Sequence, residues 1–188
     1  MNDINLFKKE GSILFKKIRS KSDLKEKDSC DGYLIESSEK IARSIIASIA
    51  SKKEKKIIAV LGGDDSFNRR AIETLKINYL VSPERGLKKD TLKQRDSGLN
   101  HVVAKEAKKK GIKIIINFSE ILSLKGKEKA IRLGKIIQNI KICRKAGCNI
   151  KIASLAKDKI LSTGEKERMA FATSLGMSSV QAKAAVKF

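Results

Sequence analysis

Short apolar runs alternate with amphipathic stretches along the chain. Residues 57–61 (IIAVL) are continuously apolar and rich in β-branched side chains, which is typical of a strand covered on both faces. Further runs of this kind, each expected to form a strand, lie at residues 13–15, 33–35, 79–81, 112–118 and 150–153. Residues 20–31 are polar and charged, which predicts a loop between the first two strands.

Amphipathic stretches follow most of these runs. Apolar residues recur at intervals of three and four between Ile41 and Ile49, which predicts a helix with one apolar stripe. Residues 99–110 end in consecutive lysines followed by Gly111, a cationic helix end with a glycine stop. Further helices are expected over residues 67–75, over residues 128–144, and after the capping-box patterns at residues 162–165 and 178–181.

The succession of strands and helices predicts an α/β protein with a parallel sheet, because parallel strands need crossover connections. A closed (β/α) barrel typically needs about 250 residues. With 188 residues, the chain is expected to form a compact or incomplete TIM-barrel-like fold, or an open sheet. Neither an internal repeat nor a low-complexity linker divides the sequence, so a single domain over residues 1–188 is predicted.

The charge of the chain indicates a polyanionic partner. Lys and Arg number 42 against 21 Asp and Glu, a net charge of +21 that points to nucleic acid or an anionic membrane. The apolar runs are too short to cross a membrane, and residues 1–6 lack the apolar core of a signal peptide. Aromatic residues make up only 4% of the chain, which favours recognition of RNA phosphates and shape over base stacking.

Cysteine and histidine usage excludes several kinds of site. Cys30, Cys143 and Cys148 lack a zinc-binding spacing and are expected to be reduced, buried thiols of a cytoplasmic protein. His101 is the one histidine, which excludes a histidine-rich metal centre. It is expected to hold a loop-to-helix junction through a hydrogen bond, because no nucleophile forms a recognisable motif beside it.

Ligands of parallel α/β folds bind at the carboxyl ends of the strands, where the loops at residues 62–65 and 82–101 are expected. The first loop either cradles a phosphate or is a tight turn with Asp65 or Ser66 as helix N-cap. The second is either a phosphate clamp or a solvated basic loop, and its cations are Arg85, Lys88, Lys89, Lys93 and Arg95. Lys151, within a predicted strand, points either into this edge or outward.

Several spaced motifs resemble those of a known family. Residues 81–83 (VSP) and 95–105 (RDSGLNHVVAK) are similar to the hallmark stretch of the thirty-kilodalton protein subunit of ribonuclease P, called protein component 3 in archaea. Further matches lie at residues 117–119, 128–130, 154–156, 175–177 and 181–184. The resemblance covers about residues 32–186, which leaves residues 1–31 as a short, divergent N-terminal unit.

The resemblance implies a TIM-barrel-like fold related to the PHP phosphoesterase superfamily, without that superfamily's metal residues. It implies membership of the ribonucleoprotein that removes 5′ leaders from precursor tRNA in the cytoplasm. In that particle the RNA performs the hydrolysis with bound Mg²⁺, so no catalytic residue, metal site or cofactor is expected in this chain. The implied partners are the ribonuclease P RNA, a small ribonuclease P protein subunit in a heterodimer or dimer of heterodimers, and, indirectly, precursor tRNA.

The basic loop and the family resemblance together predict individual site residues. The expected RNA contacts are Arg70, Lys88, Lys89, Arg95, Lys105 and Lys110. Asp96, Gly98 and His101 are expected to support the loop. Two alternatives remain open: a ribosome-associated or other structured-RNA-binding protein, which the charge fits equally well, and a barrel phosphodiesterase. The candidate groups for the latter are Asp64, Asp65, Asp96, Glu120 and His101.

Overall fold

A computed structural model describes residues 3–25, 28–52, 55–86 and 96–188. Within these residues seven parallel strands follow one another around a sheet in chain order. They are β1 (Ile4–Asn5), β2 (Ile13–Ile18), β3 (Gly32–Ile35), β4 (Ile57–Leu61), β5 (Tyr79–Val81), β6 (Lys113–Asn117) and β7 (Ile150–Ala153). The expected α/β fold with a parallel sheet is therefore confirmed.

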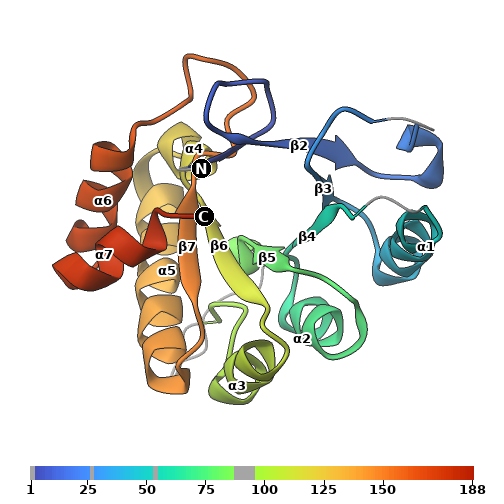
Figure 1. Ribbon diagram of the computed structural model, residues 1–188. Helices are drawn as coiled ribbons and strands as arrows, with labels where there is room; N and C mark the ends of the chain where they lie inside the picture. The colour runs from blue at the N-terminus through green and yellow to red at the C-terminus, as the bar shows by residue number, and fades with distance from the viewer. Residues whose placement is uncertain (1–2, 26–27, 53–54, 87–95) are drawn as a thin grey trace.

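Helices surround the strands (Figure 1). They are α1 (Glu39–Ala50), α2 (Asp65–Thr74), α3 (His101–Lys109), α4 (Phe118–Ser123), α5 (Gly126–Ala146), α6 (Glu165–Ser174) and α7 (Ser179–Ala185). Two 3₁₀ turns, η1 (Lys21–Asp23) and η2 (Pro83–Arg85), lie in the connections after β2 and β5. None of the helices in the described part of the chain combines the length and the apolar character that crossing a bilayer requires.

The first and last strands meet, so the sheet curves into a nearly closed barrel. The amide of Leu155, just beyond β7, donates to the carbonyl of Ile4 at 2.8 Å. The amide of Leu6 donates to the carbonyl of Ala156, also at 2.8 Å. These bonds link the two edges of the sheet, which confirms the compact barrel and makes the open-sheet alternative wrong.

A buried ion pair reinforces this closure. Oδ1 of Asp3 accepts hydrogen bonds from the amide of Ser154 at 2.9 Å and from Nη1 of Arg168. The side chains of Asp3 and Arg168 are only 8% and 2% exposed. Asp3 precedes β1 and Arg168 lies on α6, so one carboxylate ties the start of the described chain to its last strand and to α6.

The core consists of one inner and two outer layers, because side chains on a strand alternate between its two faces. Inside the barrel, alternate strand residues such as Phe15, Ala59 and Ile115 form one cluster. Outside it, the opposite faces of β2 to β6 pack against α1, α2, α3 and the end of α5. The outer faces of β6 and β7 pack against α4, α5, α6 and α7.

Several local expectations differ from the structure. The expected N-cap of α2 at Asp65 or Ser66 is wrong, because the side chain of Asp64 accepts from the amide of Phe67 at 2.7 Å. Strand β1, helix α4 and turn η1 lie where no regular element was expected. The predicted burial of the free thiols of Cys30, Cys143 and Cys148 is confirmed.

Lys151 follows neither of its expected orientations. Its Nζ donates to the carbonyls of Ala184 and Lys187, both at 2.7 Å, and lies 5.9 Å from the ring centre of Phe188. Burial and the nearby charge of Lys113 lower the pKa of Lys151. This lysine therefore secures the C-terminal end of α7 from the amino-terminal half of β7, away from the carboxyl edge of the sheet.

We expect Asp3→Ala to lower the free energy of unfolding by about 3–5 kcal/mol, since it leaves Arg168 buried without its carboxylate. Denaturant unfolding measures this change. Glu73→Ala is the matched control, because it removes an ion pair whose Arg69 and Glu73 side chains are 63% and 39% exposed. The control is expected to cost less than about 1 kcal/mol. Equal losses for the two variants would contradict a role for Asp3 in closure.

Candidate nucleic-acid interface

A chain of ion pairs crosses the carboxyl edge of the barrel. Glu36, which follows β3, binds Lys17 of β2 and the nearby Arg19, each at 2.8 Å. Burial alone would raise the pKa of Glu36, but the hydrogen bonds from Lys17 and Arg19 outweigh it and hold that pKa below its ordinary value. Glu36 is therefore ionised at neutral pH and fixes two cations at the rim.

Arg85 continues this chain to the other side of the barrel mouth. Its Nη1 lies 3.8 Å from Oε1 of Glu36, and its Nε lies 2.9 Å from Oε1 of Glu120 on α4. Arg132 on α5 contacts the same Glu120 oxygen at 3.1 Å. Arg85 was expected among the cations of a phosphate-clamping loop, yet in the structure two carboxylates hold it against the mouth.

The mouth encloses a cavity of about 270 Å³, lined in part by Lys17, Arg85, Glu120 and Lys157. The acidic candidates for a phosphodiesterase do not converge there, since Asp64 caps α2 and Glu120 is held by Arg85 and Arg132. Across the described ranges, no group of three or more His, Cys, Asp or Glu side chains is placed to hold a metal ion.

Glu84 is a buried carboxyl group beside this mouth. It is 2% exposed, and its Oε1 has no hydrogen-bond partner among the described residues. Burial raises its pKa to about 7, with repulsion from Glu120 adding to the effect and the charges of Arg132 and Arg85 opposing it. The folded protein therefore keeps this carboxyl protonated to a higher pH than the unfolded chain does.

Asn68 of α2 joins three loops at the same edge. Its Nδ2 donates to the carbonyls of Pro83 at 2.9 Å and Gly98 at 3.0 Å, and its Oδ1 accepts from the amide of Gly63 at 2.9 Å. Asn68 is fully buried, so these bonds replace the water that its amide would otherwise bind. The two ends of the basic loop at residues 82–101 are thereby held close together.

Two residues of α5 hold the same loop from the other side. Nδ2 of Asn139 donates to the carbonyl of Ser97 at 2.8 Å, and Nζ of Lys135 donates to that of Gly86 at 3.3 Å. Between these anchors, the predicted RNA contacts Lys88, Lys89 and Arg95, together with Lys93, lie outside the described residues.

The three predicted loop supports differ in what they do. Gly98 is buried with φ of +78°, and a Cβ there would lie 1.9 Å from the carbonyl oxygen of Pro83, so only glycine fits. Asp96 is half-buried and interacts with at least one neighbouring group. His101 begins α3, but its buried Nδ1 makes no hydrogen bond within the described chain. The junction is instead capped by Asn100, whose side chain accepts from the amide of Val103 at 2.9 Å.

The described RNA-contact candidates occupy different settings, and all remain predictions. Lys105 is exposed on α3. Arg70 is exposed on α2, with its Nε 2.7 Å from Oε2 of Glu39. Nζ of Lys110 donates to the carbonyls of Ile72 and Glu73 in the last turn of α2, so this lysine also caps a helix.

Helices α3 and α5 carry a surface that we call the α3–α5 basic face. The two helices pack against each other and end beside the amino ends of β6 and β7 (Figure 1). The exposed cations of this face follow the same spacing on both helices: Lys105, Lys108 and Lys109 on α3, and Lys141, Arg144 and Lys145 on α5. Lys108 reaches across to Gly147, because its Nζ lies 2.8 Å from the position a Cβ of Gly147 would take.

The cations of this face form no ion pair with any carboxylate in the described ranges, whereas Arg43, Arg69 and Arg70 on α1 and α2 each pair with a glutamate. Cations in the last turns of helices are also favoured by the helix dipole, a stabilisation of about 0.3–1 kcal/mol each. The face nevertheless gathers exposed cations that no carboxylate in the described ranges neutralises, so it is the strongest described candidate for phosphate contacts.

The anchoring residues were missed by the sequence interpretation, although a signal exists. Asn68 and Asn139 lie on the apolar stripes of α2 and α5, beside buried neighbours such as Ala71 and Ile140. A polar residue on a buried helix stripe needs a hydrogen-bond partner, which marks it as a tie to another segment. The partners of Arg85 carry no comparable signal, because they come from distant parts of the chain.

A family model described as RNase P subunit p30 matches residues 35–187. Among curated proteins, ribonuclease P protein component 3 of Thermococcus gammatolerans is 30% identical over 145 residues, which is 77% of this chain and 64% of that protein. The protein of the same name from Methanocaldococcus jannaschii is 31% identical over 119 residues, which is 63% of this chain and 48% of that protein. The matched region thus spans 64% and 48% of the length of these two relatives, less than two thirds of each.

Solved structures show the fold. A chain in the cryo-EM structure of archaeal ribonuclease P with mature tRNA superposes with a TM-score of 0.74 at 21% identity, covering 97% of this chain and 85% of that one. An amidohydrolase crystal structure gives a TM-score of 0.58 at 12% identity, covering 84% of this chain and 41% of that one. The TIM-barrel-like architecture is confirmed, while the expected relation to the PHP phosphoesterase superfamily stays a prediction.

We expect Gly98→Ala to destabilise the protein by several kcal/mol, because the new Cβ meets the carbonyl of Pro83 in addition to adopting a left-handed backbone conformation. Thermal unfolding measures the loss. Gly111→Ala is the control: its φ is +69°, but nothing lies within 4 Å of the added Cβ. The control should cost only the conformational strain of about 1–2 kcal/mol. If both variants lost the same stability, the close approach at Gly98 would not hold the loop.

Glu84 predicts a pH dependence of stability. Its folded pKa of about 7 lies above the ordinary value of 4.5, so the unfolded chain ionises first as the pH rises between these values. Stability is therefore lost through this window and stays level above it, with a change of about 2–3 kcal/mol between pH 5 and pH 8. Urea unfolding at both pH values should show this fall for the parent protein and a smaller one for Glu84→Gln. An unchanged pH dependence in the variant would contradict the assignment.

Proposed function

The chain belongs to the RNase P subunit p30 family, and from this premise we propose that it is a protein subunit of ribonuclease P, which removes 5′ leaders from precursor tRNA. In this proposal the chain binds and stabilises the catalytic RNA, and the RNA performs the hydrolysis with Mg²⁺. The observation that carries the proposal is the α3–α5 basic face, whose exposed cations pair with no carboxylate in the described ranges.

The physical role follows from charge. A folded RNA brings phosphates close together, and their repulsion must be offset by Mg²⁺ or by protein cations. Lys and Arg side chains that neutralise phosphates release condensed counterions, which strengthens binding at low salt. The chain has a net charge of +21, so it can neutralise some of the phosphates that lie near it. The RNA then needs less Mg²⁺ to reach its active fold.

The barrel mouth supports a scaffolding role over a catalytic one. Each carboxylate of the ion-pair chain, Glu36 and Glu120, is held by arginine or lysine, and burial favours the protonated form of Glu84. These groups stabilise loops and are not free to activate water. We therefore propose that this chain binds no cofactor and that the Mg²⁺ of the particle belongs to its RNA.

The partners proposed are the ribonuclease P RNA, a small ribonuclease P protein subunit and, indirectly, precursor tRNA, in a cytoplasmic particle. Lys105 is the family-derived RNA contact that lies on the basic face. Arg70, Lys88, Lys89, Arg95 and Lys110 stay in the proposal as further contacts. A different structured RNA remains the alternative, because a basic face of this kind reads phosphate positions and not a particular sequence.

The function is tested by reconstitution with ribonuclease P RNA and the remaining protein subunits. Omission of this chain should raise the Mg²⁺ concentration needed for cleavage of precursor tRNA, because unneutralised phosphates oppose folding of the RNA. Cleavage assays across a Mg²⁺ titration measure the shift. Identical titrations with and without the chain would contradict the proposal, and specific co-purification with another structured RNA would favour the alternative.

The basic face is tested with a charge-matched pair of variants. Lys105→Ala/Lys141→Ala/Lys145→Ala should weaken binding to the RNA and reduce the slope of log K against log salt by about 2–3, since three phosphate contacts are lost. The control, Lys40→Ala/Lys55→Ala/Lys166→Ala, removes three exposed lysines that lie outside α3 and α5 and should change the slope much less. Equal slopes for the two triple variants would show that net charge matters and the face does not.

A further inference from the structure

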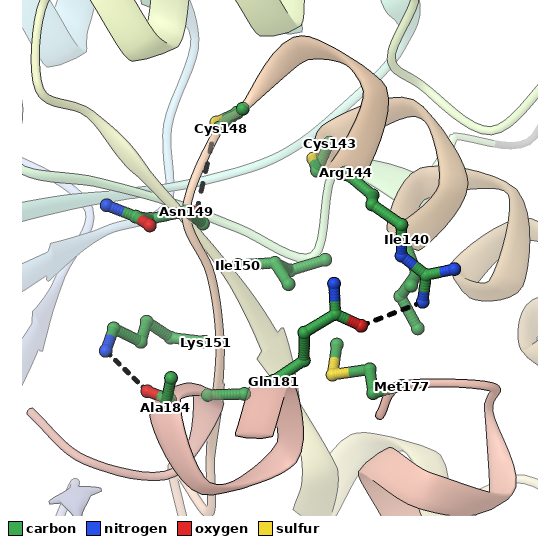
Figure 2. A pocket seen from close by; sticks show the side chains of 12 residues that line it. Ile140, Cys143, Arg144, Cys148, Asn149, Ile150, Lys151, Met177, Gln181 and Ala184 are labelled. Atoms are coloured by element: carbon green, nitrogen blue, oxygen red, sulfur yellow. Dashed lines mark hydrogen bonds between the residues drawn. The ribbon is translucent and has the colours of Figure 1, made fainter. Parts of the chain in front are cut away.

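A pocket opens at the edge of the α3–α5 basic face. It has a volume of about 240 Å³ and lies between the end of α5, the start of β7 and helix α7 (Figure 2). Arg144 of the basic face lines it, as does Gly147, over which Lys108 lies. A chain of phosphates bound along the face would therefore pass the entrance of this pocket.

We propose that this pocket receives a single unpaired nucleobase of the RNA, while the basic face holds the adjoining phosphates. The inference rests on the proposed function, because it assigns to the same interface a preference for unpaired RNA. Sites for drug-sized ligands occupy about 300–1,000 Å³, so a smaller cavity suits one ring system better than a whole nucleotide.

The walls of the pocket fit a flat ring with polar edges. Ile140 and Met177 are 3% and 4% exposed, and with Ile150 they provide an apolar surface. The thioether of methionine makes favourable contacts with aromatic rings, which is relevant in a chain without tryptophan. The guanidinium of Arg144 lies across the pocket from Ile150 (Figure 2), and guanidinium planes stack on bases of unpaired RNA.

One hydrogen-bond donor remains available in this pocket. Oε1 of Gln181 accepts from Nη2 of Arg144 at 3.0 Å and from the amide of Ser178 at 3.1 Å, which fixes the orientation of the Gln181 amide. Its Nε2 points toward the space between Ile150 and Arg144 (Figure 2) and donates no hydrogen bond to the described residues. Ring nitrogens and carbonyl oxygens of nucleobases accept such a bond.

An apolar side chain of a protein partner fits this pocket less well. It would leave the Gln181 donor buried without an acceptor, which costs about 1–3 kcal/mol. The cations around the entrance also attract a phosphate chain and give no advantage to an apolar residue. The pocket and the face together therefore favour RNA whose bases are not paired, since a base inside a duplex cannot leave its stack without cost.

The probes for this proposal are single-stranded RNA homopolymers of the four bases and an RNA duplex with the same number of phosphates. At equal salt, the parent protein should bind at least one homopolymer about tenfold more tightly than the duplex, as expected for one well-placed base contact. Gln181→Met removes the donor without adding charge, and Gln181→Glu removes it while keeping the carbonyl-type acceptor of the capping box. Both variants should lose this preference.

Asn149→Asp is the control for the negative charge that Gln181→Glu introduces. Asn149 is exposed at the same pocket, but its side chain points to the other side of β7 (Figure 2). A carboxylate there should weaken binding to both kinds of RNA equally and keep the preference. Gln181→Met should also retain the salt dependence of the parent protein, because it removes no phosphate contact. Thermal unfolding of each variant verifies that α7 remains folded.

Three results would overturn the proposal. The parent protein could bind the duplex as tightly as every homopolymer, or both Gln181 variants could keep the preference. Gln181→Met could also leave RNA binding unchanged and weaken association with the small protein subunit, which would assign the pocket to a protein partner. Failure of the parent protein to lower the Mg²⁺ requirement of ribonuclease P RNA would instead refute the proposed function, so the two failures are distinguishable.

Discussion

The whole architecture depends on closing a seven-stranded parallel barrel with a first strand of only two described residues. So short a strand offers few backbone hydrogen bonds, and the closure is completed by side chains. Asp3 binds both the amide of Ser154 and the guanidinium of Arg168, where neither charge is accessible to water. A buried pair of this kind adds little net stability over an apolar contact, but removal of one partner is costly. Asp3 therefore joins β1 to the end of β7 and to α6 at the seam of the barrel.

The two ends of the barrel differ in how their cations are partnered. At the carboxyl edge, where barrel enzymes keep their reactive groups, Glu36, Arg85 and Glu120 neutralise one another and fix the surrounding loops. At the amino edge, the lysines that end α3 and α5 lack such partners in the described ranges. Carboxylates therefore hold the mouth cations in place, whereas the exposed cations of the α3–α5 basic face are paired with no carboxylate in the described ranges. A chain of this design is suited to hold a polyanion against a rigid body.

The sequence predicts the central strands of the barrel well, but it predicts the strand that closes the barrel poorly. Continuous apolar runs such as residues 57–61 mark covered strands, because both faces of each strand are buried. Strand β1 is too short to show a period, and its pairing depends on Arg168, which lies far along the chain. The same limit applies to the site. Gly98 is evident from the motif that it occupies, whereas the role of Asn68 emerges only when three loops meet. Lys110 illustrates a third case, in which a cation in the family motif also serves as a helix cap.

The central claim is that the α3–α5 basic face contacts RNA phosphates. Lysine acetylation, read by mass spectrometry with and without bound ribonuclease P RNA, tests it residue by residue in the unmodified protein. The account predicts that RNA protects Lys105, Lys108, Lys109, Lys141 and Lys145, while Lys40, Lys55 and Lys166 react at the same rate in both states. Protection of the second group with no protection of the first would contradict it.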